Sequence, residues 1–385
     1  MRTLVGTGVS AVIVDWARSP FQRAHKGDLR TVRPDDLASQ VISGLLNRNR
    51  IDPAEFDDLI LGCAYPEAEQ GYNIGRLVSS LSGFPESVPG MTINRLCGSS
   101  MHAVISAASS IQSGWGDCYM CAGVESMSRV KRRGFNWSPN PKLSIDWPQA
   151  YVEMGVTAEN VADKWSISRT DQEEFALQSH LKSSNAIELG HFHDELIEIQ
   201  SDSGAVTVDG CIRSDTTMDA MSGLTPVFSE SGTVTAATSS PLTDGATAMI
   251  VCSEEYALSH GLSPLARIVS SSVTGCQPDL MGIGPVSSTT QLLDNIGWHL
   301  DSVDVIELNE AFSSQSLAVI SELGIDSNRV NIDGGAISIG HPLGASGARI
   351  TGKAASILDR TRSSKAIATM CIGGGMGMAI ALERP

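Results

Sequence analysis

Apolar residues along the chain alternate between short runs typical of buried strands and segments with helical spacing. The stretch 87–93, Ser-Val-Pro-Gly-Met-Thr-Ile, is typical of a strand. After Cys97 the apolar residues recur every three or four positions, at Met101, Val104, Ile105, Ala108 and Ile111. This spacing predicts an amphipathic helix over residues 98–113, with the thiol of Cys97 in its first turn. Alternation of this kind along the chain predicts an α/β fold with helices on both faces of a buried sheet.

Two segments of this pattern resemble each other. One short apolar strand is expected from Asp58 (Asp-Leu-Ile-Leu-Gly-Cys-Ala) and another from Asp304 (Asp-Val-Ile-Glu-Leu-Asn-Glu). Cys97 follows Asp58 by 39 residues, and His341 follows Asp304 by 37 residues. His341 also opens an expected helix, with Pro342 in the first turn. We therefore predict a duplicated α/β unit in which Cys97 and His341 occupy equivalent positions.

Residues 126–237 interrupt the alternation. They contain a helix expected over 171–187, Gly- and Ser-rich turns, and a basic run made of Arg129, Lys131, Arg132 and Arg133. We interpret the segment as a loop domain inserted into the first half. The predicted divisions are 1–125 (N-terminal half), 126–237 (insertion), 238–262 (end of the N-terminal half) and 263–385 (C-terminal half). The basic run is either a solvated surface or a contact with another subunit or with an anionic ligand.

Composition narrows the class of protein. The chain has 385 residues, 42% hydrophobic and 18% charged, as expected for large buried sheets. Its net charge of −16 argues against nucleic acid or an anionic membrane as the main partner. No apolar run reaches the roughly 18 residues of a membrane span. The opening stretch 4–14 is expected to be a first buried strand and lacks the form of a signal peptide. We expect a soluble, cytoplasmic protein.

The cysteines bear on both compartment and chemistry. Eight scattered cysteines in a long chain indicate free thiols in a reducing environment. Cys118 and Cys121 form a CxxC pair in an apolar run without a second ligand pair, so no metal site is expected. Cys97 is the candidate nucleophile, because a helix start favours the thiolate and is expected to lower its pKa from about 8.5 toward neutrality. The alternative is an inert thiol that fills the core.

Two further segments supply candidate groups. His341 lies in the Gly-rich stretch 334–347, where backbone and ligand can approach closely, and a histidine titrating near neutrality could accept the proton of Cys97. Cys371 opens a Gly-rich turn after a strand expected over 366–370, and backbone amides of that turn could face a developing oxyanion.

Four blocks, in order along the chain, are similar to the signature blocks of thiolases. They are Asn-Arg-Leu-Cys-Gly-Ser-Ser around Cys97, Asn-Glu-Ala-Phe from Asn309, Gly-His-Pro-Leu-Gly around His341 and Cys-Ile-Gly-Gly-Gly-Met-Gly from Cys371. The resemblance covers essentially the full length. It implies the thiolase fold, in which two duplicated halves form five layers in the order αβαβα with an inserted loop domain. The block around Cys97 is closer to the fatty-acid-degrading branch, which favours cleavage of 3-ketoacyl-CoA by CoA to acetyl-CoA and a shortened acyl-CoA.

The resemblance also implies a role for each matching residue. Cys97 would accept the acyl group, His341 would activate it, and Cys371 would move a proton to and from the α-carbon of acetyl-CoA. Asn309 would hold a water that forms one oxyanion hole with His341. The amides of Cys97 and Gly373 would form the other, and Glu310 would orient these groups. For coenzyme A, a substrate rather than a permanent cofactor, the similar positions are Met154, Arg213, Phe228, Ala236, Ser240 and Phe312.

Partners and alternatives follow from the same comparison. The expected ligands are acyl-CoA and CoA, and the expected assembly is a homodimer or homotetramer, with or without a hydratase/dehydrogenase subunit. The alternatives are a biosynthetic acetoacetyl-CoA thiolase and a non-catalytic acyl-CoA-binding subunit of a β-oxidation complex. A decarboxylating ketoacyl synthase is disfavoured, because such enzymes lack a cysteine at the position of Cys371 and have histidine where Asn309 stands. Glu153, Thr225 and Pro241 depart from the family pattern, so the sequence does not fix the CoA contacts or the acyl-chain length.

Overall fold

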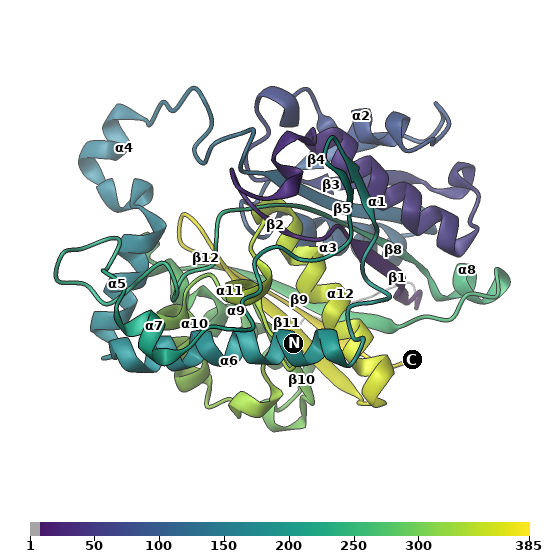
Figure 1. Cartoon of the computed structure of the whole chain (residues 1–385). Helices are drawn as coiled ribbons and strands as arrows, with labels where there is room; N and C mark the ends of the chain where they lie inside the picture. The colour runs from purple at the N-terminus through teal and green to yellow at the C-terminus, as the bar shows by residue number, and fades with distance from the viewer. Residues whose placement is uncertain (1–7) are drawn as a thin grey trace.

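The longest apolar runs form the middle of one large mixed sheet (Figure 1). The computed structural model describes residues 8–385. Strands β5 and β8 are buried at every residue, as expected for strands covered on both faces. The strands follow the order β10-β11-β12-β9-β1-β8-β5-β3-β4. Their bounds are β1 Ala11–Arg18, β3 Asp58–Gly62, β4 Gly90–Ile93, β5 Cys118–Ser126, β8 Thr243–Ser253, β9 Ala266–Gly275, β10 Val305–Leu308, β11 Lys365–Ile372 and β12 Met376–Glu383.

The strand order is mirrored between the two halves of the chain. From the centre outward it runs β1-β8-β5-β3 in the N-terminal half and β9-β12-β11-β10 in the C-terminal half. Strands β1 and β9 join the halves in an antiparallel pair, whereas β3 with β5 and β10 with β11 are parallel pairs. The predicted duplication of an α/β unit is therefore confirmed.

The structure shifts the equivalence of the halves by one residue. Asp57, rather than Asp58, is the counterpart of Asp304. Oδ2 of Asp57 accepts two consecutive N–H groups at the entry to β5, at 2.6 and 3.0 Å, and Oδ2 of Asp304 accepts two at the entry to β11, at 2.8 and 3.0 Å. The sequence comparison missed the shift because several apolar residues in a row match equally well in either register, whereas the structure fixes which side chain faces which side of the sheet.

Helices complete five layers. On the outer faces lie α1 (Pro34–Asn49) and α2 (Ile74–Leu81) in the N-terminal half, and α9 (Gly284–Ile296) and α10 (Ser313–Leu323) in the C-terminal half. Between the half-sheets, α3 (Ser99–Gln112) packs against α12 (Leu343–Thr361), and one apolar cluster contains both helices and the inner faces of both halves. The predicted order αβαβα is confirmed.

The segment between β5 and β8 adds further helices along the left and lower side of the molecule in Figure 1. They are α4 (Pro141–Asp146), α5 (Met154–Lys164), α6 (Arg169–Glu188) and α7 (Met218–Ser222), with a hairpin of β6 (Ile199–Ser201) and β7 (Gly204–Val206). The helix predicted over 171–187 is thus α6. Arg18 of β1 pairs with Glu195 and Asp209 of this segment at 2.7 and 2.6 Å, and all three side chains are buried. These ion pairs fix the segment to the sheet.

Other expected elements differ in their bounds. The strand over 87–93 begins only at Gly90, after Pro89, which lacks an N–H to donate to the ladder. The strand over 366–370 extends to Ile372 and includes Cys371. Of the first strand expected over 4–14, residues 4–7 lie outside the described residues, and β1 begins at Ala11. Across residues 8–385, every helix is too short or too polar to cross a membrane.

Candidate active site

Cys97 and His341 each lie one residue before the N-cap of a central-layer helix. Gly98 is the N-cap of α3, and Pro342 is the N-cap of α12. The predicted equivalence of the two residues is visible in this geometry. The expectation that Cys97 and Pro342 lie in the first helical turns is wrong, because both helices begin later.

The two helices touch close to their starts. Oγ of Ser100 in α3 accepts the N–H of Ala348 in α12 at 2.8 Å. A Cβ on Gly347 would lie 2.5 Å from the backbone nitrogen of Met101, so this approach requires glycine. Segments distant in sequence thereby place the thiol and the imidazole at the same end of the central layer.

The turn before Cys97 is strained and held by side chains. Leu96 has φ of 46°, in the left-handed region that a branched non-glycine residue rarely adopts. Oδ1 of Asn94 accepts the N–H of Leu96 at 2.8 Å, and Oγ of Ser99 donates to the carbonyl of Leu96 at 2.6 Å. The position of the thiol is therefore fixed by its neighbours.

Cys97 is half-buried, and its burial raises the pKa of the thiol to about 11. The N–H of Gly373 favours the thiolate and the charge of Glu125 opposes it, but both effects are smaller than that of burial. The prediction of a lowered pKa is wrong, because the thiol lies before the helix and loses more from its removal from water than it gains from the helix start. In the resting site Cys97 is a thiol.

His341 is buried and neutral. Its Nδ1 lies 2.6 Å from Oγ of Ser346, its Nε2 lies 3.4 Å from Nδ2 of Asn309, and its backbone N–H donates to Oγ1 of Thr243 at 3.0 Å. Burial, with a smaller contribution from the charge of Arg349, lowers the pKa of His341 to about 3. The expectation that this histidine titrates near neutrality is therefore wrong, and the imidazole meets a substrate in its basic form.

Cys371 lies at the end of β11 and faces the other thiol. Its side chain is buried, and burial, followed by the charge of Cys97, raises its pKa well above the ordinary value. Gly373, two residues later, directs its N–H to Cys97. The structure thus brings Cys97, Cys371 and Gly373 together.

Asn309 and Glu310 follow β10 and face different ways. Oδ1 of Asn309 is buried and has no hydrogen-bond partner among the described residues. The carboxylate of Glu310 accepts from Oγ of Ser179 and Nδ2 of Asn331, each at 2.7 Å, and from the N–H of Ile337 at 3.1 Å. Asn309 is thus free to bind a ligand or water, whereas Glu310 fixes the loop.

Three of the expected coenzyme A positions form an apolar wall beside Cys371. Met154, at the start of α5, and Phe228 pack against a buried cluster that contains Phe312 and Cys371. The rings of Phe228 and Phe312 meet edge to face, with centroids 6.1 Å apart.

The other three expected positions lie outside this cluster. The N–H of Ser240 donates to the carbonyl of Ala311 at 3.0 Å, which places it next to Phe312. Arg213 and Ala236 are exposed, and the N–H of Arg213 donates to Nδ1 of His180 at 3.1 Å.

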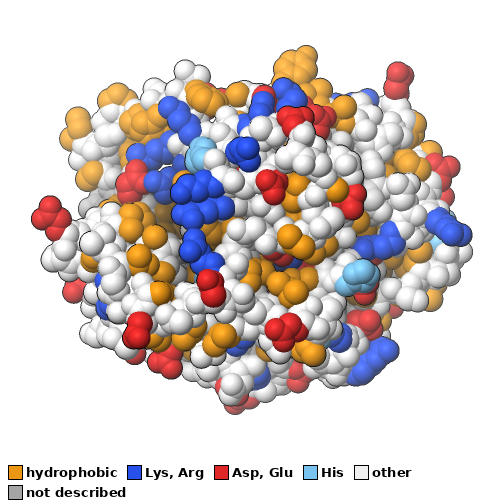
Figure 2. Space-filling model, viewed as in Figure 1, with side chains coloured by type: hydrophobic (Ala, Val, Ile, Leu, Met, Phe, Trp, Pro, Cys, Tyr) orange, Lys and Arg blue, Asp and Glu red, His pale blue; other side chains and the backbone are white. Residues whose placement is uncertain are grey.

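The basic run is partly neutralised. Figure 2 shows Lys and Arg side chains concentrated on the side of the molecule where α4 and α5 lie in Figure 1. Within the run, Arg129 pairs with Glu69, and Arg132 and Arg133 both pair with Glu153, the residue before Met154. Lys131 lies over the ring of Phe135, and the run borders the apolar wall at Glu153.

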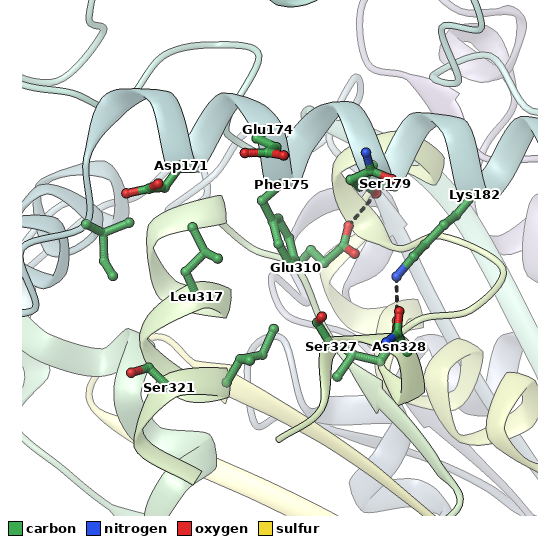
Figure 3. Close-up of a pocket in the computed structure, with 14 residues that line it drawn as sticks. Asp171, Glu174, Phe175, Ser179, Lys182, Glu310, Leu317, Ser321, Ser327 and Asn328 are labelled. Atoms are coloured by element: carbon green, nitrogen blue, oxygen red, sulfur yellow. Dashed lines mark hydrogen bonds between the residues drawn. The ribbon is translucent and has the colours of Figure 1, made fainter. Parts of the chain in front are cut away.

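A groove of about 560 Å³ opens between α6 and α10 (Figure 3). Glu310 and Ser179 line it, together with apolar side chains that include Phe175 and Leu317. Both thiols and all six expected coenzyme A positions lie outside its lining. The groove is thus separate from the thiol site, which lies beyond Asn309.

Sequence reasoning missed the residues that hold these groups. Thr243, Ser346 and Arg349 surround His341, and Glu125 faces Cys97. Only Glu125 carried a signal, as a lone charge in the apolar run that forms β5. Within residues 8–385, no cluster of three His, Cys, Asp or Glu side chains is suited to a metal ion.

Comparisons with known proteins place the chain among sequences and structures of similar length. Residues 11–255 match the family model "Thiolase, N-terminal domain", and residues 262–384 match "Thiolase, C-terminal domain". The chain is 44% identical to a 3-ketoacyl-CoA thiolase of Saccharophagus degradans, over 97% of this chain and 98% of the relative. It is 43% identical to a 3-ketoacyl-CoA thiolase of Bacillus subtilis, over 97% of this chain and 99% of the relative.

Solved structures show the same architecture. Human mitochondrial 3-ketoacyl-CoA thiolase in complex with CoA has a TM-score of 0.90 at 35% identity and covers 98% of each chain. The Bacillus anthracis acetyl-CoA acetyltransferase has a TM-score of 0.89 at 37% identity, over 98% of this chain and 99% of that chain.

Proposed function

The chain belongs to the thiolase family, and we propose that it is a 3-ketoacyl-CoA thiolase of fatty-acid β-oxidation. It cleaves a 3-ketoacyl-CoA with CoA to acetyl-CoA and a shortened acyl-CoA. The observation that carries the proposal is the proximity of two thiols, Cys97 and Cys371, with the N–H of Gly373 directed to Cys97. Acyl transfer through a covalent intermediate needs one thiol as nucleophile and a second group to move a proton at carbon.

The first half-reaction forms the acyl-enzyme. The neutral imidazole of His341 takes the proton of Cys97 while the sulfur attacks the 3-keto carbon of the substrate. The Cα–Cβ bond then breaks, and its electron pair leaves on the enolate of acetyl-CoA. The thiol of Cys371 protonates the α-carbon, which completes acetyl-CoA and leaves a Cys371 thiolate.

The second half-reaction restores the enzyme. The thiol of CoA gives its proton to the Cys371 thiolate, and its sulfur attacks the thioester on Cys97. The acyl group moves to CoA, and the protonated His341 returns its proton to the departing Cys97. Both thiols and the neutral imidazole are regenerated, so no net proton is taken up.

Two oxyanion holes are proposed for the intermediates. The backbone N–H groups of Cys97 and Gly373 would stabilise one, and a water held by Asn309 would form the other with His341. The unpartnered Oδ1 of Asn309 and the N–H of Gly373 directed at the sulfur support this assignment.

For CoA we propose contacts with Met154, Arg213, Phe228, Ala236, Ser240 and Phe312, of which the apolar wall beside Cys371 supports three. We further propose an insertion over residues 126–237 between the parts of the N-terminal half. A cytoplasmic homodimer or homotetramer is proposed as the working form, with or without a hydratase/dehydrogenase subunit that supplies the 3-ketoacyl-CoA.

The test compares thiolysis by the wild type and by Cys97→Ser across a series of 3-ketoacyl-CoA chain lengths. We expect the rate of acetyl-CoA release to fall at least about 1,000-fold, because the hydroxyl is a far weaker nucleophile. Cys252→Ser, at the end of β8 opposite to Thr243, is the matched control and should keep wild-type activity. Full activity of Cys97→Ser would refute the mechanism. If the wild type cleaves only acetoacetyl-CoA in this series, the biosynthetic alternative is favoured.

A further inference from the structure

Glu125 is a fully buried carboxylate without a cationic partner in the described part of the chain. Its Oε2 accepts the N–H groups of Ala64 and Gly344, both at 2.9 Å. Its Oε1 accepts from Nε2 of Gln70 at 2.7 Å and from the N–H of Tyr65 at 3.3 Å. A buried charge is tolerated only when it is paired or fully hydrogen-bonded. Burial raises the pKa of Glu125, and the hydrogen bonds from these neutral donors oppose the rise and favour the carboxylate.

These donors come from both halves of the chain. Ala64 and Tyr65 follow β3 in the N-terminal half, whereas Gly344 lies in the first turn of α12 in the C-terminal half. The N–H of Gly344 is one of the four that a helix start leaves unpaired, and the helix dipole favours an anion there. Glu125 therefore holds the start of α12, three residues after His341, against the other half.

In the C-terminal half, the corresponding contact between a strand end and a helix start is made by an uncharged residue. The equivalence of Asp57 and Asp304 makes Ile372, at the end of β11, the counterpart of Glu125. Ile372 packs against the start of α3, where a Cβ on Gly98 would lie 2.5 Å from Cδ1 of Ile372. An apolar residue thus suffices to join a strand end to a helix start in this fold. The charge of Glu125 needs another explanation.

We propose that Glu125 is a positioning residue for the acyl transfer, which fixes the first turn of α12 and thereby His341 relative to the loop after β3. This inference rests on the proposed function, because it takes the roles of His341 and Cys97 from it. The side chain touches neither substrate nor the reacting atoms in this role.

The charge of Glu125 has a second effect, on the nucleophile. The titratable group in contact with it is the thiol of Cys63, whose Sγ lies 3.9 Å from Oε1 of Glu125. The charge of Glu125 adds to the effect of burial in raising the pKa of Cys63, Cys97 and Tyr65. This effect acts in the same direction as burial and disfavours the thiolate of Cys97. A resting thiolate, open to alkylation and oxidation, is avoided.

The charge is tested with Glu125→Gln, which keeps the size and an oxygen for Ala64 and Gly344. The readout is the rate at which iodoacetamide alkylates Cys97 between pH 7 and 10, followed by mass spectrometry of the peptide. We expect alkylation at pH 8 to be about tenfold faster than in the wild type, equivalent to about one pKa unit. A wild-type pH profile would overturn the electrostatic part of the inference. Asp57→Asn, which alters a similar clamp at the opposite end of β5, should leave the profile unchanged.

The position is tested with Glu125→Asp, which keeps the charge but is too short to hold both segments. We expect kcat for thiolysis to fall at least tenfold, KM for both substrates to stay within twofold, and the alkylation profile to stay within twofold of the wild type. A wild-type kcat would overturn the positioning role, and this variant decides it even if Glu125→Gln does not fold. Alkylation needs no turnover, so failure of the proposed function, read from Cys97→Ser, is distinguishable from failure of this inference.

Discussion

Nδ2 of Asn309 lies 3.4 Å from Nε2 of His341, and both side chains are buried. Oγ of Ser346 donates to the carbonyl of Pro342 at 2.9 Å and therefore accepts the ring proton on Nδ1 of His341 at 2.6 Å. This leaves Nε2 as the acceptor for the amide nitrogen of Asn309. The imidazole is thereby held in the tautomer with its lone pair on Nε2, the nitrogen that faces Asn309. Asn309 and Ser346 together decide which nitrogen acts as the base.

Asn309→Ala should therefore slow the chemical step more than it weakens binding. The variant loses the group that orients Nε2 and the proposed water of one oxyanion hole, so we expect kcat to fall about 100-fold. KM for CoA should stay within about threefold, because Asn309 lies apart from the apolar wall. Steady-state thiolysis measures both constants. Asn328→Ala, at an exposed position, is the control, and a KM effect larger than the kcat effect would contradict the assignment.

The pKa values of the site predict its pH dependence. The pKa of Cys97 is raised to about 11 and that of His341 is lowered to about 3. Below pH 11 the thiolate fraction of Cys97 falls with falling pH, so its alkylation in the resting enzyme should rise about tenfold per pH unit between pH 7 and 10. His341 stays neutral throughout this range and adds no inflection.

Alkylation of Cys97 by iodoacetamide, measured peptide by peptide, checks this profile. A plateau already reached at pH 8 would show a thiolate-imidazolium pair and contradict the order of the two pKa values. His341→Asn serves as the control, because it should leave the slope unchanged.

Ser179 supports the loop after β10 from the insertion. Its Oγ donates to Glu310 at 2.7 Å, and both residues line the groove between α6 and α10 (Figure 3). In Ser179→Ala, Glu310 keeps its bonds to Asn331 and Ile337 but loses one donor to a buried carboxylate. We expect the free energy of unfolding in urea to fall by about 1.5–3 kcal/mol. Ser321→Ala, on the exposed rim of the same groove, should change it by less than about 0.5 kcal/mol.

The elements that follow from the spacing of apolar residues were predicted correctly from the sequence. The properties that depend on the burial of single side chains were not. Helical spacing after Cys97 predicted α3, and the parallel order of the halves predicted the equivalence of Cys97 and His341. The direction in which the pKa of Cys97 shifts was predicted wrongly. A helix start is visible in the sequence, whereas the burial of a thiol is not. Glu125 was missed for a related reason. Its hydrogen bonds go to backbone N–H groups, which carry no residue-type signal.

The packing of the start of α12 can be tested without touching a charge. A Cβ on Gly344 would lie 2.6 Å from the carbonyl oxygen of Val124 and 2.8 Å from Cα of Cys63. Both are backbone atoms of strand ends and cannot move aside easily. In Gly344→Ala the helix start must shift, so we expect the free energy of unfolding to fall by about 1–3 kcal/mol.

The same shift should move His341 away from Cys97. We therefore expect kcat for thiolysis to fall even at a temperature where the variant is fully folded. Gly223→Ala is the matched control, because its nearest neighbour would lie 3.9 Å away and its φ is −75°. Urea unfolding measures the stability of the two variants, and steady-state kinetics measures their kcat. Equal behaviour of both would show that the tight junction at Gly344 contributes nothing to the geometry of the site.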